Sequence, residues 1–257
     1  MAKKIKNPWM ISTFVLAGII IGTGIGLGVS QIAAVKNLLN KGGQNIQTQP
    51  ADKYEELANG QRDIEITPVS SSDYIRGAKS PKVTFVEYSD PECPYCKKFH
   101  SVLKEIVEAF PNDVQWVYRN FPLKDLHPKA FHESVALECA GEIGGNDGFW
   151  QYLDRLMEVT PGNNKLDPKE LDKIAAFVKL DKTKFSTCLS SNKYDAKIDG
   201  QIQEAVQNGG DATPFSVVIA PDQKKYLLVG QVDFQPLSEA IKRLINPEAA
   251  APVTPTK

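Results

Sequence analysis

The sequence has little of several features that would mark a particular class of protein. Its 257 residues contain only four cysteines and three histidines, and its 30 basic side chains nearly balance its 31 acidic ones. Four cysteines in a chain of this length are too few for a small domain framed by disulfides. A net charge close to zero gives no sign of a nucleic-acid partner. Hydrophobic residues make up 42% of the chain, which is enough for the core of one ordinary domain.

Charge is also missing from one long stretch near the N-terminus. No charged residue occurs between Lys6 and Lys36, and residues 9–30 within this gap are mostly apolar. A helix needs about 20 apolar residues to cross a bilayer, so this run predicts one transmembrane helix. Basic residues favour the cytoplasmic side of a membrane, and three lysines precede the run. We therefore expect residues 1–8 in the cytoplasm and the rest of the chain on the outer side of a cell membrane.

A cleavable signal peptide is the alternative for this segment. Its apolar core is usually 7–15 residues long and ends at a small-x-small cleavage site. The run over residues 9–30 is longer, and no clear Ala-x-Ala follows it closely. We therefore favour an uncleaved membrane anchor.

The remaining sequence divides into a linker, one domain and a tail. Residues 31–79 are largely polar and contain glycines, which is typical of a connecting segment. Residues 247–257 are rich in proline and alanine, and we expect them to be disordered. One globular domain without an internal repeat is left over residues 80–246.

The hydrophobic pattern of this domain changes between the strand and helix periods. It predicts strands at 83–88, 114–118, 215–219 and 226–229, and helices at 93–110, 127–139, 149–158, 169–178, 183–189, 194–208 and 236–245. A β-α-β start favours parallel strands, and the late pair of strands favours an antiparallel hairpin. The fold class is therefore α/β, with one mixed sheet flanked by helices and a helical insertion at about 127–208.

The most informative motif is Cys93-Pro94-Tyr95-Cys96, which follows the first predicted strand and begins the first predicted helix. A cysteine at a helix start faces unpaired N–H groups and the positive end of the helix dipole, and both favour its thiolate. Pro94 suits the first helical turn. Cys96 lies one turn later, so its sulfur can reach Cys93. We interpret Cys93 as the exposed, attacking cysteine, Cys96 as the more buried resolving cysteine and Tyr95 as a residue that tunes the redox potential.

Metal binding is the alternative role of this motif. His100 lies four residues after Cys96 and would add a third zinc ligand, but Cys139 and Cys188 lack the paired spacing of structural zinc sites. We expect His100 on a solvated helix face; when protonated, it would alternatively stabilise a thiolate by its charge. A non-catalytic binding domain, such as a holdase, is a further alternative to a redox enzyme, together with the zinc site.

The order of these elements and motifs resembles a known family. A strand, Cys-Pro-Tyr-Cys, a helix, a second strand, a helical block, Thr213-Pro214-Phe215, a hairpin and a last helix are together similar to DsbA-like thiol–disulfide oxidoreductases. The segments 132–141 and 149–152 are similar to the first insertion helices of that family. The resemblance covers about residues 80–246 and implies a thioredoxin-like fold with a helical insertion.

The resemblance also implies roles for single residues. Pro214 matches a cis-proline beside the active sulfur, which would leave the backbone of Thr213 free to pair with a substrate strand. Glu87 matches a buried acid that aids proton transfer with the resolving cysteine; the alternative is a solvated glutamate at a strand edge. Because an exported domain meets an oxidising compartment, we interpret Cys139 and Cys188 as a structural disulfide, with two free core cysteines as the alternative.

Together these observations predict an extracytoplasmic, membrane-anchored enzyme that introduces disulfides into exported proteins. The exchange needs no organic cofactor and no metal. The resemblance implies two kinds of partner, namely exported proteins that contain cysteines and a membrane quinone reductase of the DsbB or vitamin-K-epoxide-reductase kind. An extracytoplasmic reductase or isomerase is the main alternative, since thioredoxin and DsbA have redox potentials that differ by about 150 mV.

Overall fold

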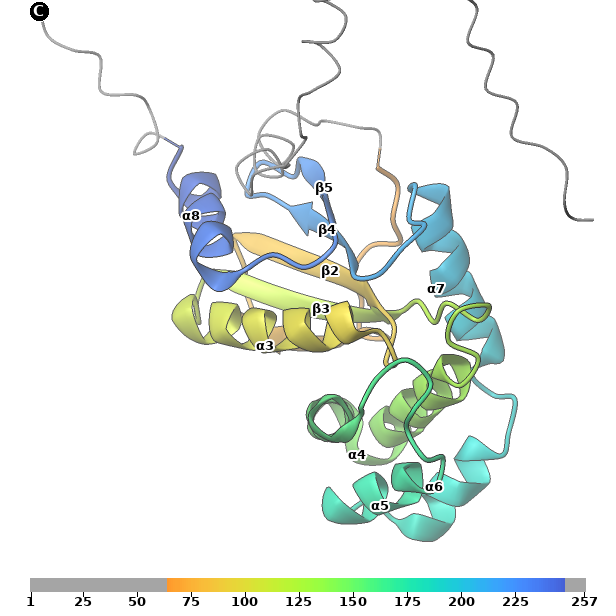
Figure 1. The fold of residues 1–257 in the computed structure, drawn as a ribbon. Helices are drawn as coiled ribbons and strands as arrows, with labels where there is room; N and C mark the ends of the chain where they lie inside the picture. The colour runs from red at the N-terminus through yellow and green to blue at the C-terminus, as the bar shows by residue number, and fades with distance from the viewer. Residues whose placement is uncertain (1–63, 248–257) are drawn as a thin grey trace, which may run out of the picture. The chain divides into compact units, whose positions relative to one another are not determined.

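The strands of the chain form one mixed sheet in the order β1-β3-β2-β4-β5 (Figure 1). The computed structural model describes residues 64–247. Strands β2 and β3 are parallel, and the other neighbouring strands are antiparallel. The strands are β1 (Tyr74–Gly77), β2 (Val83–Ser89), β3 (Val114–Asn120), β4 (Phe215–Ile219) and β5 (Lys225–Val229). The mixed sheet predicted from the sequence is therefore confirmed.

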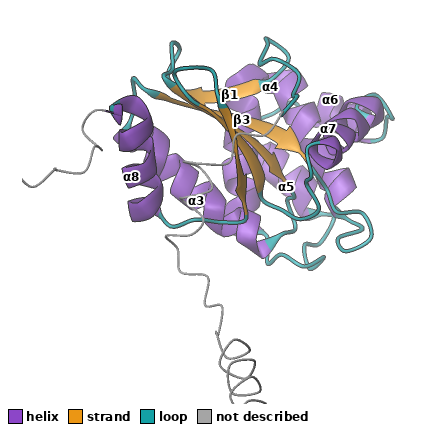
Figure 2. Cartoon of the chain, turned by 90° about the horizontal axis from the view of Figure 1, so that it is seen from above, coloured by secondary structure: helices purple, strands orange, loops and turns teal. Residues whose placement is uncertain are grey.

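Helices cover both faces of this sheet (Figure 2). Helices α3 and α8 pack together against one face, and α7 contacts β2 and β3 from the other. Helices α4, α5 and α6 gather at one end of the sheet and, with α7, form the helical insertion (Figure 1). The helices are α3 (Pro94–Ala109), α4 (Ala130–Val159), α5 (Glu170–Phe177), α6 (Lys182–Leu189), α7 (Asp195–Gln207) and α8 (Phe234–Ile245).

The two faces follow from the alternation of side chains along each strand. In β2, Phe85 joins the core under α3 and α8, and the next residue, Val86, joins the core under α7. In β3, Trp116 and Val117 divide in the same way. Glu87 shares the face of Phe85, so the strand itself directs this carboxyl group toward the layer that contains α3.

Strand β1 lies in the segment that the sequence analysis assigned to the linker over residues 31–79. It pairs with β3, and the side-chain amide of Asn146 bonds the N–H and C=O of Ile75 at 2.8 and 2.9 Å, which covers its outer edge. Ile64 is also buried in the core. The predicted domain boundary at residue 80 is therefore too late. The strand has only four residues, Tyr-Ile-Arg-Gly, of which three are half-buried and the last is exposed, and so short a run does not show a strand period.

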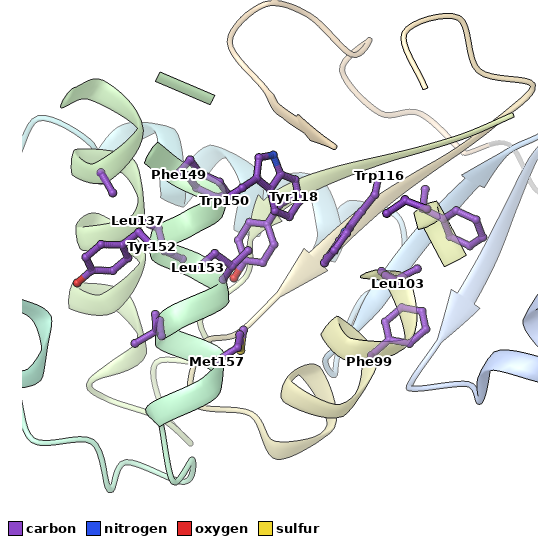
Figure 3. Packing of buried hydrophobic residues seen from close by; sticks show 14 of the residues in the cluster. Phe99, Leu103, Trp116, Tyr118, Leu137, Phe149, Trp150, Tyr152, Leu153 and Met157 are labelled. Atoms are coloured by element: carbon purple, nitrogen blue, oxygen red, sulfur yellow. The ribbon is translucent and has the colours of Figure 1, made fainter. Parts of the chain in front are cut away.

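The insertion is anchored on the sheet by aromatic packing (Figure 3). Trp116 of β3 packs against Trp150 of α4 with ring centroids 4.6 Å apart, and Tyr118 packs against Phe149 at 5.5 Å. Helix α4 unites the two helices predicted at 127–139 and 149–158, with a kink at Gly145, where φ is 65°. This packing places the insertion beside the helix that carries the two cysteines.

Several predictions from the sequence concern residues outside the described range. They are the cytoplasmic residues 1–8, the transmembrane helix at 9–30, the linker up to residue 63 and the tail from residue 248. Within residues 64–247, every helix is too short or too polar to cross a bilayer.

Candidate active site

Cys93 and Cys96 lie at the start of α3, directly after the central strand β2. Cys93 caps the helix with an extended backbone, and Pro94 occupies the first helical position. Both cysteines are free thiols, with Cys96 fully buried and Cys93 5% exposed. Cys93 is thus the more accessible of the two, but the expectation of an exposed Cys93 is wrong. Tyr95, between them, is 57% exposed.

Two loops distant in the sequence lie beside Cys93 and its neighbours. The Cys93 thiol donates to the carbonyl oxygen of Thr213 at 3.5 Å, and the Thr213–Pro214 peptide bond is cis. On another side, a Cβ atom at Gly162 would lie 3.1 Å from the carbonyl oxygen of Glu92, and the φ of Gly162 is 73°, so glycine suits this close approach. The structure therefore brings together Cys93, Thr213 and Pro214, as the resemblance implied, and adds the loop around Gly162.

The two thiols differ strongly in acidity. The hydrogen bond from the Cys96 thiol, helped by the N–H groups of Tyr95 and Cys96, lowers the pKa of Cys93 from 9 to about 6. Burial, the bond to Cys93 and the nearby charges raise the pKa of Cys96 well above its usual value. Near neutral pH the negative charge therefore resides on the sulfur of Cys93, the more accessible of the two.

Glu87 lies on β2 and is fully buried. The Ser89 hydroxyl and the Trp116 indole N–H donate to its two oxygens at 2.8 and 2.9 Å. Burial raises the pKa of Glu87 from 4.5 to about 7, against these two hydrogen bonds. The alternative of a solvated glutamate at a strand edge is wrong, because β2 is the middle strand of the sheet. Its charge also raises the pKa of Cys96, so the two groups interact electrostatically.

Replacing Glu87 by glutamine should remove a pH-dependent loss of stability. The folded-state pKa of about 7 exceeds the ordinary 4.5, so Glu87 stabilises the fold below pH 4.5 and loses this contribution as the pH rises to 7. Relative to wild type, Glu87→Gln should therefore gain about 3 kcal/mol of unfolding free energy between pH 4.5 and pH 8. Urea unfolding at both pH values measures this, and an equal difference at both would contradict the raised pKa.

The sequence analysis predicts His100 on a solvated helix face, and this prediction is wrong. It is 4% exposed, its Nε2 lies 2.8 Å from Asp154 Oδ1, and its ring meets Trp116 edge-on. Asp154 belongs to α4, and the packing of the insertion against α3 buries this face of α3. Burial lowers the pKa of His100, against the opposing effect of Asp154. The imidazole is therefore directed to Asp154, and no group of three potential metal ligands occurs among residues 64–247.

Cys139 and Cys188 form a disulfide between α4 and α6, with their Cα atoms 5.7 Å apart. The alternative of two free core cysteines is therefore wrong. The bridge lies within the helical insertion and fixes its first helix to a later one.

Sequence reasoning missed a set of buried charged residues around the motif. Glu92, fully buried, accepts hydrogen bonds from the N–H groups of Asn164 at 2.7 Å and Leu166 at 3.3 Å. Lys97, which is half-buried, donates to the carbonyl of Thr160 at 2.7 Å. Residues on both sides of the two cysteines thus hold the loop around Gly162 in place. Asp90 and His127 are also buried. The sequence signal that could have indicated this set is the pair of acidic residues directly before the motif, Asp90 and Glu92.

This geometry agrees with the similarity of the chain to known proteins. A family model described as thioredoxin matches residues 70–243. DsbA2 of Pseudomonas aeruginosa is 29% identical, with a TM-score of 0.58, over 72% of this chain and 98% of that one. A thioredoxin-like oxidoreductase from Silicibacter pomeroyi is 26% identical, with a TM-score of 0.57, over 68% and 92%. BdbD of Bacillus subtilis shares the fold at 19% identity and a TM-score of 0.59, over 71% and 97%.

The curated relatives are much longer proteins. The Na(+)/H(+) antiporter NhaA 1 of Salinispora arenicola is 30% identical over 158 residues, which are 62% of this chain and 23% of the antiporter. The antiporter NhaA of Herminiimonas arsenicoxydans is 32% identical over 143 residues, 55% of this chain and 21% of that protein. The chain thus spans less than a quarter of these relatives. The family match over most of its length shows that the chain belongs to the thioredoxin family, and the solved structures that it resembles include the DsbA type.

Proposed function

We propose that this enzyme introduces disulfides into exported proteins through Cys93 and Cys96, while anchored to a cell membrane with its domain outside the cytoplasm. The observation that carries the proposal is the unequal acidity of the two thiols, with the pKa of Cys93 lowered to about 6 and that of Cys96 raised. A stable thiolate favours the reduced form of the enzyme. Its disulfide form is therefore a strong oxidant, as in DsbA.

The reaction begins with the Cys93–Cys96 disulfide form. A client thiolate attacks the sulfur of Cys93, which is more accessible than that of Cys96. The bond between Cys93 and Cys96 breaks, and its electron pair passes to the sulfur of Cys96. Glu87, whose pKa is about 7, supplies the proton that this buried thiolate needs. A second client thiolate then attacks the client's own sulfur in the mixed disulfide, and Cys93 leaves as a thiolate.

The Thr213–Pro214 loop supports a docking mode for the client. The carbonyl of Thr213 lies 3.5 Å from the Cys93 sulfur. An extended client segment that pairs with the Thr213 backbone would thus bring its cysteine to Cys93.

Each turnover leaves two electrons on the enzyme, so an oxidant must remove them. A membrane-embedded, quinone-linked partner suits this step, because an anchor at residues 9–30 would hold the domain at the same membrane surface.

A redox titration of the full-length chain tests the proposed direction. After equilibration in graded glutathione buffers, free thiols are alkylated and counted by mass. We expect two of the four cysteines to titrate nearer to the potential of DsbA, about −120 mV, than to that of thioredoxin, about −270 mV. Titration near the thioredoxin value would indicate a reductase or isomerase instead. If no pair titrates, disulfide exchange by Cys93 and Cys96 is wrong.

A further inference from the structure

Asp90 contacts both cysteines through its backbone. Its N–H donates to the sulfur of Cys96 at 3.5 Å, and its carbonyl accepts from the N–H of Cys93 at 3.1 Å. Residue 90 directly follows β2, so its position relative to the sulfurs depends on how the short turn before α3 is held. None of the steps proposed above uses this residue.

The carboxylate of Asp90 is fully buried and has three hydrogen-bond partners. It accepts from the N–H of Glu92 at 2.7 Å and from the N–H of Leu123 at 2.8 Å, and its Oδ2 lies 2.9 Å from Nδ1 of His127. Burial raises the pKa of Asp90, and these three contacts oppose that effect. A carboxylate is an acceptor only, so the contact with His127 requires a proton on Nδ1.

His127 is itself fixed in place. It is 3% exposed, its N–H donates to the carbonyl of Leu123 at 2.7 Å, and its carbonyl accepts from Ala130 at the start of α4. The Asp90–His127 contact therefore connects the turn that carries the cysteines to the loop that leads into the insertion.

We propose that Asp90 and His127 form a positioning pair that holds the N–H of residue 90 on the sulfur of Cys96 and so speeds the departure of that sulfur. The inference rests on the proposed function. When a thiolate attacks Cys93, the Cys93–Cys96 bond breaks and Cys96 receives the electron pair as a thiolate. The N–H of residue 90 is then a hydrogen-bond donor to a charged, buried atom, where such a bond contributes most. If the pair is lost, the turn shifts and the leaving sulfur loses its donor.

The rate at which reduced glutathione opens the Cys93–Cys96 disulfide of the full-length chain tests this pair. Asp90→Asn and His127→Leu should each lower the second-order rate constant about tenfold, the effect of one lost hydrogen bond to a charged atom. His127→Asn keeps an N–H donor at the position of Nδ1, so its rate should stay within about threefold of wild type. His127→Leu leaves the two backbone contacts of Asp90 intact and keeps the test available if Asp90→Asn does not fold.

Asp73→Asn is the matched control, because Asp73 is another buried aspartate in an ion pair, with Arg119 at 3.0 Å. This variant should lower the melting temperature without changing the glutathione rate. Unchanged rates in folded Asp90→Asn and His127→Leu would overturn the proposal. Equal slowing by His127→Asn and His127→Leu, or by Asp73→Asn, would also overturn it. A wild-type disulfide that does not react with glutathione would contradict the proposed function itself, which is a distinct result.

Discussion

The Cys93→Ser variant is expected to oxidise no client, because it lacks the sulfur that the client attacks. A serine oxygen cannot form the enzyme's disulfide. Cys96 cannot take over, since it is fully buried and its pKa is raised. We expect the rate of disulfide formation in a two-cysteine peptide to fall at least about a thousandfold, toward the background reaction. Mass spectrometry of alkylated peptide measures this rate.

The Cys96→Ser variant is the matched control, since it removes the other sulfur of the same motif. Its Cys93 thiolate can still attack a disulfide in an oxidised client, which forms a mixed disulfide and releases one client sulfur as a thiolate. Cys96 is no longer present to break that bond, so mixed disulfides between Cys93 and its clients should accumulate. Both variants should remain folded, with the Cys139–Cys188 bridge intact. Retained oxidation by Cys93→Ser would remove the proposed mechanism, and trapping at another cysteine would assign the attack to that residue.

The elements around the site could be predicted where their side chains follow one clear period. Strands β2 to β5 and helices α3 and α8 each bury a continuous apolar face, and their positions agree with the pattern. The place of the motif Cys93-Pro94-Tyr95-Cys96 at the start of α3 could be predicted, because a β-rich run precedes it and an amphipathic helix follows it. The proximity of Cys93 to Thr213, which is 120 residues away in the sequence, was predicted only from the family resemblance.

The burial of polar side chains could not be predicted, because it depends on the segment that covers them. His100 and Glu87 are two examples. His100 is on α3, and only the packing of α4 removes it from solvent. Glu87 points from the middle strand of the sheet toward the layer that contains α3, and the packing of that layer buries it. Asp90 and His127 are 37 residues apart, and nothing in either local sequence indicates the other.

Removing the Cys139–Cys188 bridge should have the largest effect on stability. Its two cysteines are 49 residues apart in the sequence, and closing a loop of that size in the unfolded chain is worth about 4 kcal/mol in the chain-entropy model. For a domain of this size, that loss corresponds to a melting temperature lower by about 10 °C. Cys139→Ala combined with Cys188→Ala avoids a buried hydroxyl, and calorimetry of the oxidised chains measures the difference.

The same double variant separates stability from chemistry. The bridge joins α4 to α6, whereas Cys93, Cys96 and Thr213 lie on α3 and the loop before β4. The rate of the glutathione reaction should therefore stay within about twofold of wild type. An unchanged melting temperature would mean that the unfolded chain retains structure that already holds the two cysteines near each other. A large fall in rate would show instead that the bridge must fix the insertion for the loop around Gly162 to pack correctly against the residues on either side of Cys93.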